Sequence, residues 1–273
     1  LLVRNYNLAY LNLSNNYLKS FYIENTKSLT SNQIGLVELD LNYNKIVNQT
    51  DTFLSGFNKL ESLAYSKNGF ESFDFQLFKN FSYLTFVDLS CNRIAAIKSP
   101  NFTFLNKIKT LNLSNNLIEK VSTHLLENLI RLDSLDLSKN RLKALDQLVF
   151  SKLNNLDYLN LNENKLRTLP VLSDLKKLEF LDLGRNSLTS IESASFRKLF
   201  VLERLSLASN RLENISQDLF NDLSSLVYLD LSNNSIQSIE SGSFRFLANL
   251  QSLLINSTKL KVIEKLGELS SIK

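Results

Sequence analysis

Residues that could carry catalysis or hold a metal are scarce in this chain of 273 residues. It contains one cysteine, Cys91, and one histidine, His124, so a nucleophile–base pair would have to use His124. No metal-ligand spacing surrounds either residue, and the six glycines are scattered and form no phosphate-binding loop. Carboxylate pairs recur throughout the chain, which favours solvated surface over acid–base catalysis. The sequence predicts a non-enzyme without a cofactor.

The composition is typical of a folded protein. Hydrophobic residues make up 44% and charged residues 21%, and the net charge of +4 is too small to indicate nucleic-acid binding by itself. No apolar run approaches the roughly 18 residues that span a bilayer, and the first residues do not resemble a signal peptide. Any secretion signal or membrane anchor is therefore expected outside this chain.

One spacing pattern organises the sequence. The segment Leu8-x-x-Leu11-x-Leu13-x-x-Asn16-x-Leu18 recurs with its asparagine mostly 24 residues after the previous one. The asparagines are Asn16, Asn44, Asn68, Asn92, Asn116, Asn140, Asn164, Asn186, Asn210 and Asn234, and Thr258 takes the same place in a further copy. The first interval has four extra residues between Phe21 and Leu36, and the interval from Asn164 to Asn186 is two residues short.

The pattern predicts how each copy folds. Leu-x-Leu alternation indicates a short strand with one buried face, and stacked copies form a parallel sheet with strands about 4.8 Å apart. The chain leaves the strand at the asparagine, whose amide can satisfy backbone groups that the turn exposes. Loss of one such buried amide should cost about 1–3 kcal/mol.

A phenylalanine column stands ten residues after the asparagine. Its members are Phe78, Phe102, Phe150, Phe196, Phe220 and Phe244, with Leu54 and Leu126 in the same position. A binding groove is one interpretation, but the fixed inward phase favours core packing.

These motifs resemble the leucine-rich-repeat family over essentially the whole chain. The resemblance implies an α/β solenoid, a horseshoe with a parallel concave β-sheet and an irregular or short-helical convex side. The 24-residue length with its phenylalanine is similar to the typical animal extracellular class found in Toll-like receptors, Slit and chaoptin. We expect residues 1–273 to form a single domain of about eleven repeats, and an internal fragment, because neither cysteine-rich cap of that class is present.

Two columns of strand residues should face outward on the concave surface. The x of Leu-x-Leu is mostly aspartate or asparagine, including Asp182, which is expected to keep the sheet hydrophilic. The residue before the strand leucine is less regular and brings together Tyr158, Phe180, Arg204 and Tyr228. Exposed aromatics and arginine are typical of interface hot spots, so these five residues are the predicted protein-binding site. Surrounding carboxylates favour a basic partner.

A second charged column follows the asparagines on one flank: Lys45, Arg93, Arg141, Lys165, Arg211 and Lys259. We hypothesise that Arg141, Lys165 and Arg211 grip a sulfated glycosaminoglycan or another polyanion. The alternative is a row of merely solvated cations.

Glycosylation sequons bear on the compartment. The chain has eight, against about six expected from its composition by chance. Asn48, Asn80, Asn101 and Asn214 are expected off the strands and are the candidate glycan sites, whereas Asn12 and Asn112 belong to the concave column.

The resemblance favours an ectodomain of a cell-surface or secreted receptor or adhesion protein, as in innate immunity, located outside the cell. An intracellular scaffold or regulatory subunit with the same concave face is the alternative. A protein ligand is expected, with a homo- or heterodimer as a further option. Nucleic acid is not expected, and membrane attachment is expected only through segments outside this chain.

Overall fold

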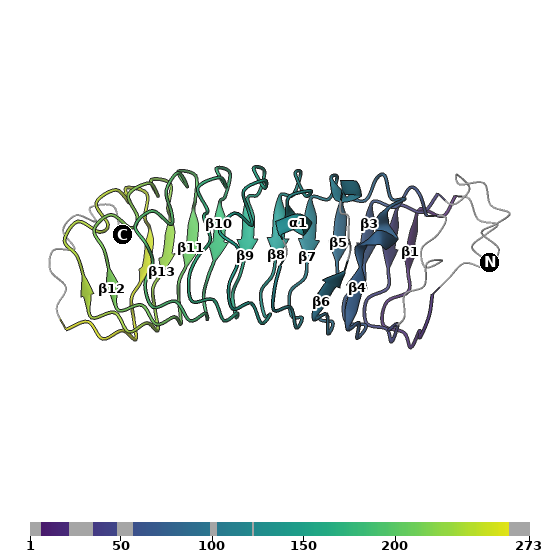
Figure 1. The fold of residues 1–273 in the computed structure, drawn as a ribbon, viewed down its shortest axis with the longest axis horizontal. Helices are drawn as coiled ribbons and strands as arrows, with labels where there is room; N and C mark the ends of the chain where they lie inside the picture. The colour runs from purple at the N-terminus through teal and green to yellow at the C-terminus, as the bar shows by residue number, and fades with distance from the viewer. Residues whose placement is uncertain (1–6, 22–34, 48–56, 99–102, 122, 262–273) are drawn as a thin grey trace.

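The protein is an elongated stack of coils whose parallel sheet runs along its length (Figure 1). The computed structural model describes residues 7–21, 35–47, 57–98, 103–121 and 123–261. Eleven strands form this main sheet: β1 (Tyr10–Asn12), β2 (Glu38–Asp40), β3 (Ser62–Ala64), β5 (Phe86–Asp88), β7 (Thr110–Asn112), β8 (Ser134–Asp136), β9 (Tyr158–Asn160), β10 (Phe180–Asp182), β11 (Arg204–Ser206), β13 (Tyr228–Asp230) and β15 (Ser252–Leu254). The predicted solenoid with a parallel sheet is confirmed.

Each strand pairs with its neighbour in the register that the leucine pattern predicts. Leu181 of β10 pairs with Leu159 of β9 and with Leu205 of β11, and all three side chains are fully buried. The residues on either side of each central leucine point outward, because side chains alternate along a strand. The two-residue deletion between Asn164 and Asn186 leaves this register intact and is therefore absorbed outside the strands.

The asparagines that recur at the end of each repeat motif, which we call the ladder asparagines, hydrogen-bond to the backbones of two successive coils. Together with Thr258 in the same position, they are the ladder residues. The Asn140 amide nitrogen donates to Leu137 O and Ser138 O of its own coil and, at 2.9 Å, to Leu113 O of the preceding coil. Its Oδ1 accepts the amide proton of Ile118. Apart from the two end copies, the described ladder residues are buried and repeat this back-reaching pattern. The predicted role of the asparagine is confirmed.

The phenylalanine column fills the interior between coils. Phe196, Phe220 and Phe244 stack with ring centroids 6.3 and 6.1 Å apart and nearly parallel planes. Phe78, Phe150 and Leu126 are likewise buried, which confirms core packing for the described members. Phe102 and Leu54 lie outside the described residues, as do the extra residues before Leu36.

The return half of each coil is mostly irregular, with a few short elements. These are β4 (Ser72–Asp74), η3 (Phe75–Phe78), β6 (Ala96–Lys98), η4 (Thr103–Leu105), α1 (Thr123–Leu126), β12 (Asn214–Ile215) and β14 (Ser238–Ile239). β4 pairs with β6 and β12 with β14, each as a two-stranded parallel sheet separate from the main one. Within the described ranges, no helix is both long and apolar enough for a membrane span.

Candidate functional site

The aromatic column forms two stacked pairs on the outer face of the main sheet. The rings of Tyr158 and Phe180, on neighbouring strands, lie 4.5 Å apart with planes 9° from parallel. The guanidinium carbon of Arg204 lies 4.7 Å from the ring centre of Tyr228, on the next two strands. The four predicted residues therefore form one continuous row across β9, β10, β11 and β13.

The three rings of this row are half-buried and keep one side toward solvent. Burial raises the pKa of the Tyr158 hydroxyl, and the charges of Asp136 and Asp182 raise it further. Burial also raises the pKa of Tyr228, with Asp230 contributing and Arg204 acting in the opposite direction. Both phenols thus stay neutral hydrogen-bonding groups in solution near neutrality.

An acidic row lies directly beside the aromatic row. Asp133, Asp157, Glu179 and Glu203 occupy the position before it in four successive coils. Their backbones are hydrogen-bonded in sequence, with Asp157 N donating to Asp133 O at 2.9 Å and Glu179 N to Asp157 O at 2.8 Å. Burial, followed by the charges of Asp133 and Glu179, raises the pKa of Asp157. The carboxylates are therefore close enough to repel one another.

The aspartate and asparagine column on the other side of the aromatic row has a structural task that the sequence did not suggest. Asp136 Oδ1 accepts the amide proton of Ser138 at 2.8 Å, and Asp182 Oδ1 that of Gly184 at 2.8 Å. The same bond to the residue two positions later occurs in most coils. Where the residue is aspartate or asparagine, its side chain thus ends the strand with an Asx turn, besides making the sheet hydrophilic.

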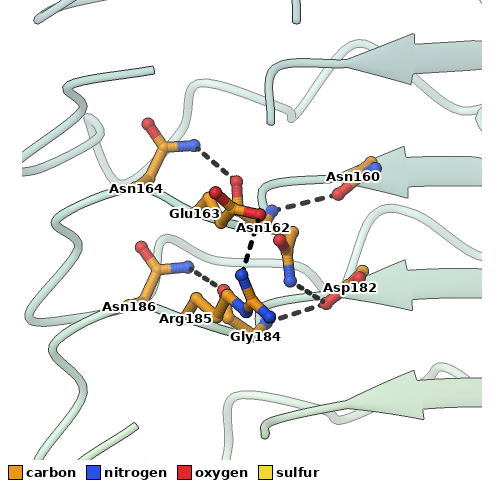
Figure 2. A network of polar contacts seen from close by, with 8 residues as sticks. All are labelled: Asn160, Asn162, Glu163, Asn164, Asp182, Gly184, Arg185 and Asn186. Atoms are coloured by element: carbon orange, nitrogen blue, oxygen red, sulfur yellow. Dashed lines mark hydrogen bonds and ion pairs between the residues drawn. The ribbon is translucent and has the colours of Figure 1, made fainter. Parts of the chain in front are cut away.

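A polar network links two coils at the ends of β9 and β10 (Figure 2). Asn162 Nδ2 donates to Asp182 Oδ1 at 3.2 Å, and Arg185 forms an ion pair with Glu163 at 3.3 Å. Gly184 makes room for the first contact, since a Cβ there would lie 2.7 Å from Asn162 Nδ2. Asp182, predicted as a ligand contact, is thus also a structural hydrogen-bond acceptor.

The predicted basic row on the flank is accompanied by a second row of cations. The residue before each ladder position has a positive φ between 51° and 57° in eleven coils, as at Lys139 and Arg185. Together the two positions flanking the ladder form what we call the basic strip, whose exposed cations are Lys45, Lys67, Arg93, Lys139, Arg141, Lys165, Arg185, Arg211 and Lys259. Glu163 is the one acid at these positions within the described residues. The sequence did not reveal this second row, because the positive φ that places these residues has no characteristic residue type.

The predicted glycan sites are distributed as follows. Asn80 is exposed after η3, as expected. Asn214 is also exposed, but the expectation that it lies off the strands is wrong, because it begins β12 on the return side and accepts a 2.6 Å hydrogen bond from Ser238 Oγ. Asn48 and Asn101 lie outside the described residues.

The single histidine and the single cysteine lie apart from the aromatic row on the outer face of the main sheet. His124 is exposed on α1 with Nδ1 3.1 Å from Glu127 Oε1, and Cys91 is exposed with Sγ 3.2 Å from Asn115 Nδ2. In the part of the chain that the structure describes, no three His, Cys, Asp or Glu side chains are placed to hold a metal ion.

Comparisons with known proteins agree with this architecture. The family model described as leucine rich repeat matches residues 82–142, 130–188 and 200–260. A leucine-rich-repeat protein of Leptospira interrogans has a similar structure, with 26% identity, a TM-score of 0.80, and coverage of 89% of this chain and 60% of the other. None of the curated proteins matches the chain by sequence.

Two solved complexes also contain similar structures. The ectodomain of the Arabidopsis thaliana membrane receptor kinase GASSHO1/SCHENGEN3, bound to Casparian strip integrity factor 2, is 27% identical, with a TM-score of 0.69 and coverage of 89% of this chain and 29% of that one. An octameric complex of Latrophilin 3, Unc5D and the leucine-rich-repeat protein FLRT2 gives 22% identity, a TM-score of 0.79, and coverage of 100% and 85%, a likeness of fold alone. The chain therefore spans 60% and 29% of the Leptospira and plant proteins. It belongs to the leucine-rich-repeat family, whose stacked coils are a scaffold for protein interaction.

Proposed function

We propose that the chain binds a protein partner on the outer face of β9, β10, β11 and β13, and that the partner presents a basic segment. The observation that carries this proposal is the row formed by Tyr158, Phe180, Arg204 and Tyr228, which has the acidic row on one side and the aspartate and asparagine column on the other. Ordinary sheet solubility requires none of these aromatic side chains, and their solvent-facing sides are the apolar area that a partner would cover.

The chemistry of the row suits a cationic ligand. Stacked aromatic rings provide rigid, flat apolar area and accept cations on their faces. Asp133, Asp157, Glu179 and Glu203 would accelerate the approach of a basic partner and orient it. Because these carboxylates repel one another, as the raised pKa of Asp157 indicates, a bound cation would relieve that repulsion. Binding should weaken as salt concentration rises.

The experiment compares peptides and variants. A synthetic peptide of about twelve residues that alternates arginine with leucine is titrated against the protein, with glutamate replacing arginine in the control peptide. Phe180→Ala and Tyr228→Ala should each weaken binding of the basic peptide about tenfold or more. Phe86→Ala is the matched control, because Phe86 lies in the same outward column on β5 without the acidic row beside it. Unchanged binding by folded Phe180→Ala and Tyr228→Ala proteins would rule out this face.

We further propose that the protein is the ectodomain of a secreted or cell-surface receptor or adhesion protein. The 24-residue repeat class and the likeness to a plant receptor ectodomain support this setting. Expression in secretory cells followed by mass spectrometry should reveal glycan on Asn80 and Asn214. An unoccupied Asn80 and Asn214 in secreted, folded protein would favour the intracellular scaffold instead.

A second candidate activity, the capture of a sulfated glycosaminoglycan, is favoured by the added row of cations in the basic strip. Nine basic side chains against one acid give this flank a net positive charge, which is interrupted at the coils of Asn116 and Asn234. Charge reversal at Arg141, Lys165 and Arg211 should lower the salt concentration that elutes the protein from heparin. Reversal at Lys152, Lys176 and Lys198, exposed on the return side, is the matched control. Equal elution of the two triple variants would contradict the assignment.

A further inference from the structure

Two tyrosines stand on the flank of the stack at the N-terminal end of the basic strip, near β1 in Figure 1. Tyr17 follows the ladder residue of its coil and is 82% exposed. Tyr43 precedes the ladder residue of the next coil and is 49% exposed. At these two positions the other coils carry mostly charged residues, serine or asparagine, and none carries an aromatic residue. The fold therefore does not require a ring at either place.

Each of the two rings lies beneath a lysine of the following coil. Lys45 Nζ lies 4.8 Å from the centre of the Tyr17 ring. Lys67 Nζ lies 4.5 Å from the centre of the Tyr43 ring. In both pairs the lysine occupies the position of the tyrosine one coil later, and a backbone bond from Lys45 N to Leu18 O at 2.8 Å keeps the first two coils in this register. The flank thus carries two exposed cation–π pairs in successive coils.

The rings change which ligands this end of the basic strip can hold. Lysines attract the sulfate and carboxylate groups of any polyanion. The face of an aromatic ring is partially negative, so it also attracts polarised C–H bonds such as those on the face of a sugar ring. Because Tyr17 is largely open to solvent despite its lysine, a ligand can cover more of its ring. An anionic polymer built of sugar rings can use both kinds of group, whereas a polyanion without rings can use the lysines alone.

We propose that Tyr17 and Tyr43, with Lys45 and Lys67, form a sugar-stacking subsite for a sulfated polysaccharide whose chain runs along the basic strip. The inference rests on the proposed capture of a glycosaminoglycan by that strip, and it assigns to the tyrosines the recognition of the sugar itself. Coils are about 4.8 Å apart at the strands, so such a chain would meet the two rings and then the cations of the following coils. The subsite lies beyond the ends of the strands, apart from the aromatic row on the sheet face.

The test compares heparin with polyphosphate, a polyanion that has no sugar rings, by titration against the protein at one salt concentration. The double variant Tyr17→Ser with Tyr43→Ser removes both rings and keeps both lysines. Serine occurs at the same two positions in other coils, as Ser187 and Ser209, so the coils should keep their fold. Thermal unfolding checks that every variant is folded.

Two further variants serve as controls. Tyr83→Ser is the matched control, because Tyr83 is 55% exposed and lies 4 residues before the buried Val87 of β5, on the flank where the chain enters the strands. Lys107 of the next coil lies over its ring, with Nζ 5.4 Å from the ring centre, so the same kind of pair is lost away from the basic strip. Tyr17→Phe with Tyr43→Phe keeps both rings and removes only the hydroxyls.

We expect Tyr17→Ser with Tyr43→Ser to weaken heparin binding about five- to tenfold and polyphosphate binding less than about twofold. The phenylalanine pair and Tyr83→Ser should bind heparin like the unmodified protein. An equal loss for both polyanions, or unchanged heparin binding by the folded serine pair, would overturn the proposal. Tighter binding of single-stranded DNA than of heparin would also overturn it, because the rings would then stack on bases.

Failure of the glycosaminoglycan proposal itself gives a different result. Charge reversal at Arg141, Lys165 and Arg211 would then leave heparin binding unchanged. Failure of the subsite alone would keep that charge dependence and remove only the dependence on the tyrosines. Absence of heparin binding by the unmodified protein would overturn both.

Discussion

Two columns with the same spacing run along this molecule, and they behave in opposite ways. The ladder asparagines are buried and make nearly the same hydrogen bonds in every inner coil. The residues before the strand leucine are partly exposed and change from coil to coil, from Thr110 and Ser134 to Tyr158 and Phe180. The asparagine column is the same in nearly every coil because each coil needs the same hydrogen bonds to stack on its neighbour. The column before the strand leucine has no such requirement, so its residues can vary and serve recognition. Substitutions in the two columns should therefore separate stability from binding.

The largest effect on stability is expected from Asn140→Leu. The substitution removes the acceptor of the buried Ile118 amide and one of the donors to each of three carbonyls, which keep a second donor. The free energy of unfolding should therefore fall by about 3 kcal/mol. Urea unfolding measures it. Asn154→Leu, at an exposed asparagine of the next coil, should change the free energy by less than about 0.5 kcal/mol. Similar losses in both variants would remove the distinction between the columns.

Gly184→Ala should have the next largest effect. The added Cβ would displace the Asn162 amide from Asp182 and lower the free energy of unfolding by about 1 kcal/mol. Several other coils carry serine at both positions, as at Ser114 and Ser138. The double variant Asn162→Ser with Gly184→Ser should therefore be more stable than the sum of its single variants predicts. Additive effects in this double-mutant cycle would show that the two side chains are not coupled.

Phe180→Ala tests the variable column itself. Loss of the stack with Tyr158 should lower the free energy of unfolding by about 1 kcal/mol, whereas the tenfold loss of affinity expected of the same variant corresponds to about 1.4 kcal/mol of binding free energy. The same urea experiment on Tyr158→Ala and on the double variant isolates the ring–ring coupling. A loss as great as that of Asn140→Leu would make this column part of the core.

The smallest effect is a pH dependence at Asp157. Its pKa is raised above the ordinary 3.8 by burial and by the neighbouring Asp133 and Glu179, so ionisation of this carboxyl opposes folding at higher pH. Asp157→Asn should raise the melting temperature slightly at about pH 7. The gain should vanish at about pH 2.5, where the carboxyl is protonated in both the folded and the unfolded state. An equal gain at both pH values would exclude ionisation as the cause.

The fold could be predicted from the sequence because its main determinants recur at a fixed stride. The recurring leucines set the register of the strands, the asparagines set the turns, and the phenylalanines fill the core. Leu159, Asn140 and Phe196 are buried at the positions that this repeat predicts. The outward columns followed from alternation along the strand, so the row from Tyr158 to Tyr228 could be named in advance.

Features that depend on local backbone geometry were not predictable in the same way. The positive φ at Lys139 and Arg185 has no residue signature, since neither residue is glycine or asparagine. The Asx turn at Asp182 was not predictable either, because an aspartate is common at any exposed strand position and does not by itself indicate a turn.

Thr258 gives the ladder an unequal last member. Each inner asparagine reaches back to the preceding coil, whereas the Thr258 hydroxyl donates to Ile255 O of its own coil at 3.2 Å. The coil of β15 is therefore joined to its neighbour by backbone pairing and side-chain packing without the amide clasp. Opening of that coil should be less cooperative with the coils before it, so under mechanical load or proteolysis this coil should separate from its neighbour before the inner coils separate from theirs.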